Sequence, residues 1–348
     1  MSAEVVASAP PVVDAEALRT RRILRFAIGI TLGMTLATGI AWPLSFLTPV
    51  LVGLLLSSPA PLTLRAGLAF IALIGLAMGA SLAFSIALLS YPVLFLALVG
   101  LLLFRIFHAA SGDANPLSIL WMVVGFCAIP LVTLTSAQAG ATVAAFITIG
   151  AAVAVALTLL VQGLIPDPAV SSAAVAPPTP KSIPEASERF RSAAISTLAV
   201  WPLLVFFYAF QLTGDLLVLI FAAILSISAN MRAGWKGGIA LIIANLGGGV
   251  IAIVVYNLLV AVPEFGFFVV LMLLTTLLIG QRRFSDAPTA GLYGSAINTV
   301  LIIIGGVTTS TDEAGAEIYV RITQIIIAVI YVVVSLGLLE SLWKRKES

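Results

Sequence analysis

The sequence predicts an all-α polytopic membrane protein with about twelve transmembrane helices. Hydrophobic residues make up 61% of its 348 residues and charged residues only 9%, whereas an average soluble domain has roughly a quarter of its residues charged. The apolar runs are also long and continuous, and a spanning helix needs about 20 apolar residues. Because the strands of a membrane barrel would give short alternating segments instead, we expect helices.

Twelve apolar runs account for the predicted spans. In the first half they lie near residues 23–40, 43–58, 66–89, 92–107, 117–134 and 139–164. In the second half they lie near 194–211, 215–229, 235–260, 264–280, 289–307 and 319–341. Between them the sequence PDPAVSSAAVAPPTPKSIPEASE predicts an extended cytoplasmic linker. The resulting divisions are a tail at 1–22, a six-helix repeat at 23–165, the linker at 166–188, a second six-helix repeat at 189–343 and a tail at 344–348.

The lysine and arginine residues agree with this count, because cytoplasmic loops carry the excess of these residues. With the N-terminus inside, the cytoplasmic segments contain Arg19, Arg21, Arg22, Arg25, Arg65, Arg105, Lys181, Arg189, Arg191, Arg232, Lys236, Arg282, Arg283, Lys344, Arg345 and Lys346. The outer segments contain Arg321. The first eighteen residues lack the pattern of a cleavable signal. We therefore expect a retained N-terminus and both termini in the cytoplasm.

The two halves share landmarks at a shift of roughly 170 residues. Pro92 opens the fourth span as Pro263 opens the tenth, and Asp113 precedes the fifth span as Asp286 precedes the eleventh. Six spans per half would give the halves the same orientation, related by an axis along the membrane normal. Chance similarity of apolar helices is the alternative, and hydropathy alone does not account for matching Arg, Pro and Asp.

Short second spans in both halves are the first indication of a substrate path, since broken or short helices in matching positions often line a site. Trp42 and Pro49 belong to the first of these spans. A tilted helix or a locally thinned bilayer is the alternative explanation. Trp42 and Trp235 also suit membrane interfaces, where tryptophan anchors helices.

The ninth span supplies further candidates, because Asn245 precedes Gly247, Gly248 and Gly249. A buried amide needs a hydrogen-bond partner. A loosened backbone at the glycines would offer carbonyl groups to a site, although close helix packing is the structural alternative. Asn298 in the eleventh span is another candidate, with hydrogen bonding between helices as its alternative role.

Charged residues are absent near the middle of the predicted spans, where ion-coupling carboxylates usually lie. Asp113 and Asp286, at matching cytoplasmic positions, are therefore the candidates for coupling. Their alternative role is to cap the following helix, since Asp or Asn precedes Pro in both places.

Several classes of chemistry have no support in the sequence. It contains no GxxxxGK[ST] loop, no HExxH pair and no GxSxG elbow, and its single histidine and single cysteine, Cys127, do not make a metal site. We expect no enzymatic activity, no catalytic residues, no cofactor and no bound metal. The basic residues are dispersed in short loops, so nucleic-acid binding is not expected either.

Three stretches carry a family resemblance: RTRRILRFAIGITLG, LLLSSPAPLTLRAG and LSISANMRAGWKGGIALIIANLGGG. They resemble the fusaric acid resistance and aromatic acid exporter superfamily of bacterial inner-membrane proteins, over roughly 20–165 and 189–343. Many members carry a sizeable cytoplasmic region, which the short linker replaces here. The resemblance implies export of small, often aromatic, organic acids, commonly with a periplasmic adaptor of the membrane-fusion type.

Together these features predict a secondary exporter of small organic anions in the bacterial inner membrane. We expect its cavity between the halves, lined by the second, third, eighth and ninth spans, and we expect the bilayer, an adaptor and further copies of the chain as partners. A passive channel and a membrane scaffold that transports nothing are the alternatives.

Overall fold

A computed structural model describes residues 15–166 apart from 43, 59 and 113, residues 185–212 and residues 235–307, with scattered positions within 218–226 and 323–343. Every regular element in these ranges is an α-helix. Seven of the described helices are long and apolar enough to cross a membrane. The protein is therefore a multi-pass α-helical membrane protein.

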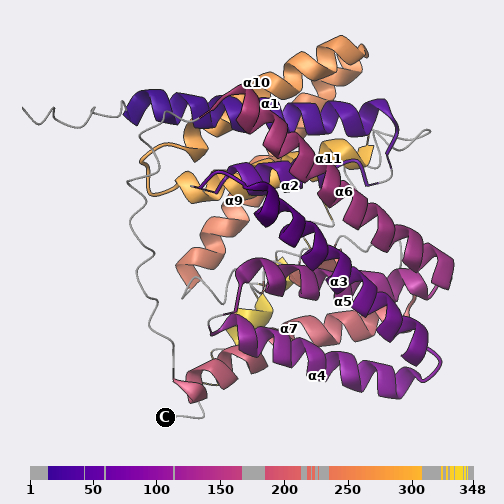
Figure 1. Ribbon diagram of the computed structural model, residues 1–348. Coiled ribbons are helices and arrows are strands. Elements are labelled where there is room, and N and C mark those ends of the chain that lie inside the picture. The colour runs from indigo at the N-terminus through magenta and orange to yellow at the C-terminus, as the bar shows by residue number, and fades with distance from the viewer. Residues whose placement is uncertain are drawn as a thin grey trace, which may run out of the picture.

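The described helices coincide with ten of the predicted spans (Figure 1). The first half contains α1 (Ala15–Gly39), α2 (Leu47–Leu56), α3 (Leu64–Leu88), α4 (Pro92–Ala110), α5 (Pro116–Thr133) and α6 (Ala137–Leu164). The second half contains α7 (Ala186–Ala209), α9 (Trp235–Ala261), α10 (Phe265–Arg283) and α11 (Ala290–Val307). The predicted spans near 215–229 and 319–341 lie outside the described residues except for scattered positions.

Polar residues set the starts of several helices. The hydroxyls of Thr63 and Ser136 accept hydrogen bonds from the first turns of α3 and α6. Asn115 caps α5 by accepting a 2.9 Å bond from the backbone N–H of Leu117, and Pro116 follows in the first turn, where its missing N–H costs nothing. The cap expected in this connection is therefore Asn115, whereas Asp113 lies outside the described residues.

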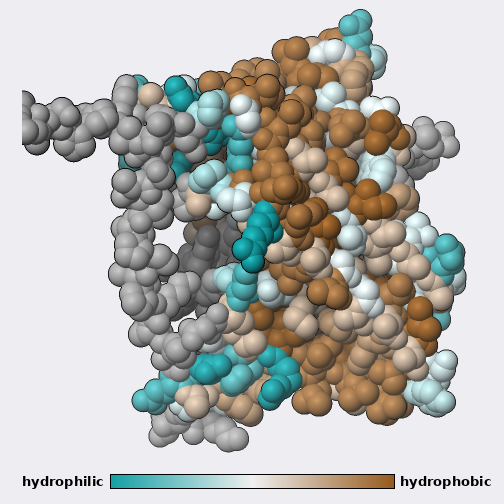
Figure 2. Space-filling model, viewed as in Figure 1, coloured by the Kyte–Doolittle hydropathy of each residue, from teal (hydrophilic) through white to brown (hydrophobic). Residues whose placement is uncertain are grey.

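The outer surface is what a lipid environment requires. Figure 2 shows an apolar surface across the middle of the molecule, with hydrophilic residues gathered toward its two edges. Large apolar side chains such as Val93 and Leu76 are 84% and 73% exposed. In water such a surface would drive aggregation, and in a bilayer it faces the acyl chains.

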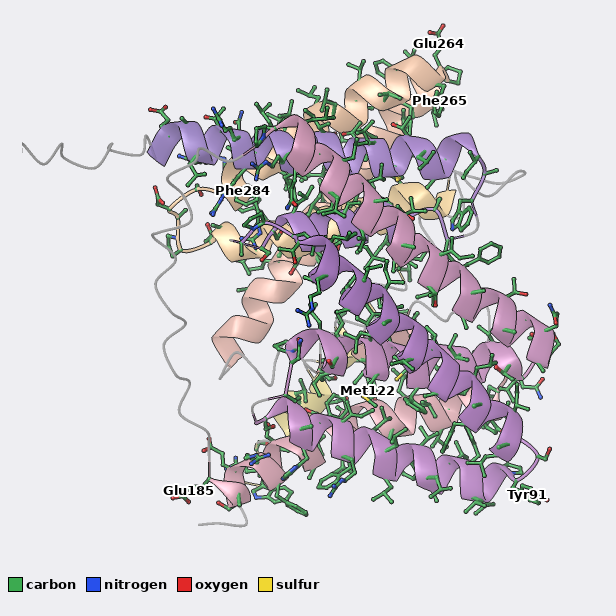
Figure 3. The ribbon with its side chains drawn as sticks, in the orientation of Figure 1. Tyr91, Met122, Glu185, Glu264, Phe265 and Phe284 are labelled. Atoms are coloured by element: carbon green, nitrogen blue, oxygen red, sulfur yellow. The ribbon has the colours of Figure 1, made fainter. Side chains whose placement is uncertain are left out.

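Two helix pairs join the halves of the chain, α1 with α10 and α4 with α7. In the first pair the rings of Phe26 and Phe284 meet edge to face at 5.4 Å. At the other end of the pair a Cβ added at Gly39 would lie 3.4 Å from the ring of Phe265. The two helices are therefore antiparallel, which fits Figure 3, where Phe265 and Phe284 lie at opposite ends of α10.

The second pair is held by an indole ring. Trp201 of α7 donates a 2.8 Å hydrogen bond from Nε1 to the carbonyl oxygen of Leu96 on α4. Gly100 makes room for this ring, because a Cβ there would stand 2.7 Å from Nε1. A small residue thus lets the two helices approach closely, as is common in membrane interiors.

One end of the bundle collects the basic N-terminal segment. Arg21 and Arg25 donate hydrogen bonds to the carbonyl oxygens of Pro166 and Ile165, at the end of α6, and Arg19 donates to that of Gln281 near the end of α10. These arginines lie on α1, which begins eight residues before the predicted span because hydropathy does not register a polar first turn. Figure 3 shows Glu185 at this same end and Tyr91 at the opposite one.

The second predicted span is shorter than expected. The sequence suggested a crossing over 43–58, but α2 has ten residues and is about 15 Å long, half of the hydrocarbon thickness. The irregular residues at its ends complete the crossing, and neighbours bind their polar groups: Ser45 donates a 2.7 Å bond to Gly305 O, and Leu62 N–H donates a 3.1 Å bond to Gln162 Oε1. Irregular backbone is tolerated at membrane depth only when protein covers it.

These contacts also distinguish a short span from a re-entrant hairpin. The start of α2 lies near the end of α11, and the segment after α2 lies beside the end of α6, where the arginines of α1 bind. Because α2 connects opposite ends of the bundle, it is a short span with irregular ends.

Candidate functional site

The most polar contact among the sequence candidates lies between α9 and α11. The hydroxyl of Thr299 donates a 2.6 Å hydrogen bond to Oδ1 of Asn245. Both residues are buried, Asn245 being 5% exposed and Thr299 fully enclosed. The amide predicted to need a partner therefore has one on the neighbouring helix.

The glycine triplet next to Asn245 brings the two helices together. A Cβ added at Gly248 would stand 2.5 Å from the carbonyl oxygen of Ala296, whereas Cβ atoms at Gly247 and Gly249 would meet nothing within 4 Å. The helix continues through all three glycines. The expectation of a loosened backbone is therefore wrong for α9, because α11 packs directly on Gly248 and the backbone stays helical.

The candidates of the second span lie on the other side of α11. Pro49 is buried in the first turn of α2, where it interrupts no helical hydrogen bond, and its Cα would lie 3.2 Å from a Cβ at Gly33. Trp42 is half-buried in the connection before α2 and meets the ring of Phe146 edge to face at 5.2 Å. Pro49 thus begins a short helix and does not break a long one.

Helix α11 links these two groups of candidates. Its outer part receives the connection before α2, since a Cβ at Gly305 would stand 2.7 Å from Cβ of Phe46. Its middle part contacts α9 at Ala296 and Thr299. The sequence assigned the cavity to other spans, so α11 is the element that sequence reasoning missed. Asn298, half-buried beside Thr299, was its only indication.

The remaining candidates lie apart from this region. Asp286 is exposed in the connection between α10 and α11, so it is at the surface of the bundle and not between helices. Trp235 begins α9, but its side chain lies outside the described residues, as does Asp113. Among the described residues there is no group of three His, Cys, Asp or Glu side chains that could hold a metal ion.

A second polar region was not anticipated. Arg22 and Arg25 line a pocket with Ser58, Ala60, Pro61 and Gln162. The sequence showed these arginines only as markers of the cytoplasmic side, because charge patterns give the side of the membrane and not the depth of a side chain. Arg25 is in fact 6% exposed.

The fold defines this chain as a multi-pass α-helical membrane protein. Residues 22–161 match a family described as "Protein of unknown function (DUF2955)". The match spans α2 to α6 and most of α1, which are the helices of the first half. Neither the curated proteins nor the solved structures contain a match to this chain.

Proposed function

We propose that this protein is a secondary transporter, built from two six-helix repeats in parallel orientation, that exports small organic anions across a bacterial inner membrane. The observation that carries the proposal is the reciprocal packing of the halves. If α1 corresponds to α7 and α4 to α10, then the pair α1–α10 is the image of the pair α7–α4. Each half thus docks its first helix on the fourth helix of the other.

A single sequence interval supports the same correspondence. Helix α1 begins at Ala15 and α7 at Ala186, while α3 begins at Leu64 and α9 at Trp235. The interval is 171 residues in both cases, from 15 to 186 and from 64 to 235. Repeats that begin their helices at one constant interval are expected from a duplicated sequence.

The closest helix crossings repeat with this interval too. A Cβ at Gly125 of α5 would stand 3.3 Å from the carbonyl oxygen of Ala77 on α3, and one at Gly248 of α9 would stand 2.5 Å from that of Ala296 on α11. From 77 to 248 and from 125 to 296 the interval is again 171 residues. The glycine has changed helix, while the crossing point has stayed in place.

Two repeats joined by only two helix pairs suit alternating access, in which one half moves against the other around a central site. We place the substrate path along α2, α11 and α9, where Trp42, Pro49, Asn245, Gly248 and Asn298 lie. The Asn245–Thr299 pair is its most polar described contact. The cytoplasmic termini, a periplasmic adaptor, assembly into a homo-oligomer and coupling through Asp113 or Asp286 belong to the same proposal.

The class of substrate comes from the resemblance to the aromatic acid exporters. A panel of aromatic and aliphatic carboxylates tests it, because a ligand that binds only the folded state raises stability, by about 2.7 kcal/mol at a hundred times its Kd. We expect a dose-dependent rise in the melting temperature of the purified protein for aromatic acids, with aliphatic acids of equal charge as the control. No rise with any acid would favour the scaffold alternative.

A further inference from the structure

A small polar pocket lies where the basic end of α1 meets the connection between α2 and α3 and the end of α6. It is lined by Arg22 and Arg25 from α1, by Ser58, Ala60 and Pro61 from the connection, and by Gln162 from α6. We propose that this pocket binds the phosphate group of an anionic phospholipid. This inference does not depend on the transport proposal, since a channel or a scaffold would bind the lipid equally well.

The charge of the pocket is held in place by the backbone. Arg25 is 6% exposed and donates a 2.6 Å hydrogen bond from Nε to the carbonyl oxygen of Ile165. This bond fixes the plane of the guanidinium group that lines the pocket. Arginine remains positively charged at physiological pH and presents its donors in a planar fork that matches phosphate oxygens.

Neutral donors complete the lining. Gln162 accepts a 3.1 Å hydrogen bond at Oε1 from the backbone N–H of Leu62, so the amide nitrogen is the donor end of this side chain. Ser58 is exposed at the rim and adds a hydroxyl. A phosphate group has several oxygens that accept hydrogen bonds, so guanidinium, hydroxyl and amide donors suit it together.

The surroundings favour a phospholipid over a soluble phosphate. Leu164 follows Gln162 closely in the sequence and is 67% exposed, and Leu64 and Leu68 at the start of α3 are 63% and 58% exposed. These side chains form an apolar surface beside a basic pocket at one end of the helices. Anionic lipids carry both groups that such a site would contact, and basic pockets between transmembrane helices bind their head groups.

The test uses the purified full-length chain in an uncharged detergent. It is titrated with phosphatidylglycerol and, in parallel, with phosphatidylcholine of the same acyl chains, and the melting temperature is recorded. We expect a saturable rise with phosphatidylglycerol alone. Equal rises with the two lipids would overturn the proposal, because phosphatidylcholine has a phosphate but no net charge.

Variants locate the effect in the pocket. Arg22→Gln should weaken the apparent affinity for phosphatidylglycerol about tenfold, as expected for the loss of one charge-assisted hydrogen bond. Arg105→Gln is the matched control, since Arg105 is an exposed arginine on α4 that does not line the pocket. Equal losses in both variants, or none in Arg22→Gln, would contradict the assignment. The melting temperature without lipid shows whether each variant folds, and Ser58→Ala at the exposed rim decides the question if Arg22→Gln does not.

A further titration separates the two sources of phosphate. Glycerol phosphate and inorganic phosphate are added over the same concentration range as the lipid. A rise with phosphatidylglycerol only supports the lipid site, whereas equal stabilisation by glycerol phosphate would overturn it in favour of a soluble ligand.

Discussion

Gly248 of α9 lies directly against Ala296 of α11, with room for no further atom between them: a Cβ at Gly248 would stand 2.5 Å from the Ala296 carbonyl oxygen and 2.9 Å from Cβ of Thr299. Its neighbours Gly247 and Gly249 face open space. The three glycines are equivalent by composition, and only their positions on the helix separate them. Their substitutions should therefore have different effects.

Gly248→Ala should destabilise the protein by about 1–3 kcal/mol, because the added methyl group overpacks the contact with a backbone atom. Gly247→Ala should leave stability unchanged or raise it by up to about 1 kcal/mol, since alanine favours the helix. Unfolding of the purified variants in detergent measures both effects. Equal stability of the two variants would show that α9 and α11 do not cross at Gly248.

Gly100 and Trp201 should be energetically coupled. Trp201→Phe loses the hydrogen bond to Leu96 O, worth about 1 kcal/mol, and Gly100→Ala forces a methyl group against the indole ring. In the double variant the smaller ring relieves this overlap, so the cost of Gly100→Ala should fall by about 0.5 kcal/mol or more. Strictly additive costs in the double-mutant cycle would contradict the packing of α7 on α4.

The sequence predicted the helices far better than their neighbours. Apolar runs locate ten described helices because helix length and hydropathy are local properties. Pairings such as α1 with α10 depend on contacts such as Phe26 with Phe284, whereas Leu, Ile and Val surfaces look alike to any neighbour. The shortness of α2 escaped prediction as well, because Pro49 is compatible both with a break and with a first turn.

The candidate site was predictable to a similar extent. Asn245 stands out because an amide in an apolar run must be hydrogen-bonded. Its partner Thr299 carries no such signal, since threonine is common in membrane helices and usually bonds its own backbone, as Thr275 does to Leu271. The pocket at Arg25 was missed because its residues come from three separate parts of the chain.

The antiparallel pair of α1 and α10 can be tested by cross-linking. The hydroxyl oxygens of Thr31 and Thr276 are 3.2 Å apart, so Thr31→Cys with Thr276→Cys should form a disulfide under mild oxidation. The background is Cys127→Ala, which removes the buried native thiol. Loss of maleimide labelling, restored by reduction, measures the bond.

Thr275→Cys combined with Thr31→Cys is the matched control. Thr275 is also buried but points about 100° further round the helix, and its hydroxyl bonds the carbonyl oxygen of Leu271. This pair should remain largely reduced under the same conditions. Similar oxidation of both pairs would mean that the two helices are not held in the described register.

Asn245→Leu should abolish transport while the protein remains folded. The substitution removes the acceptor of the Thr299 hydroxyl, which can still bond the carbonyl oxygen of Ser295 at 3.2 Å. Asn257→Leu is the control, because this exposed amide of the same helix bonds only Ile253 O among the described groups. Uptake or release by reconstituted variants decides: normal transport by Asn245→Leu would remove this residue from the substrate path.

The central claim is that the protein moves organic anions, and the flux of a labelled aromatic carboxylate through vesicles reconstituted with the purified chain tests it most directly. We predict accumulation against the concentration gradient of the acid when a proton gradient is imposed, and none in vesicles without protein. Flux that only follows the gradient of the acid itself would identify a channel, and the absence of any flux would contradict the account.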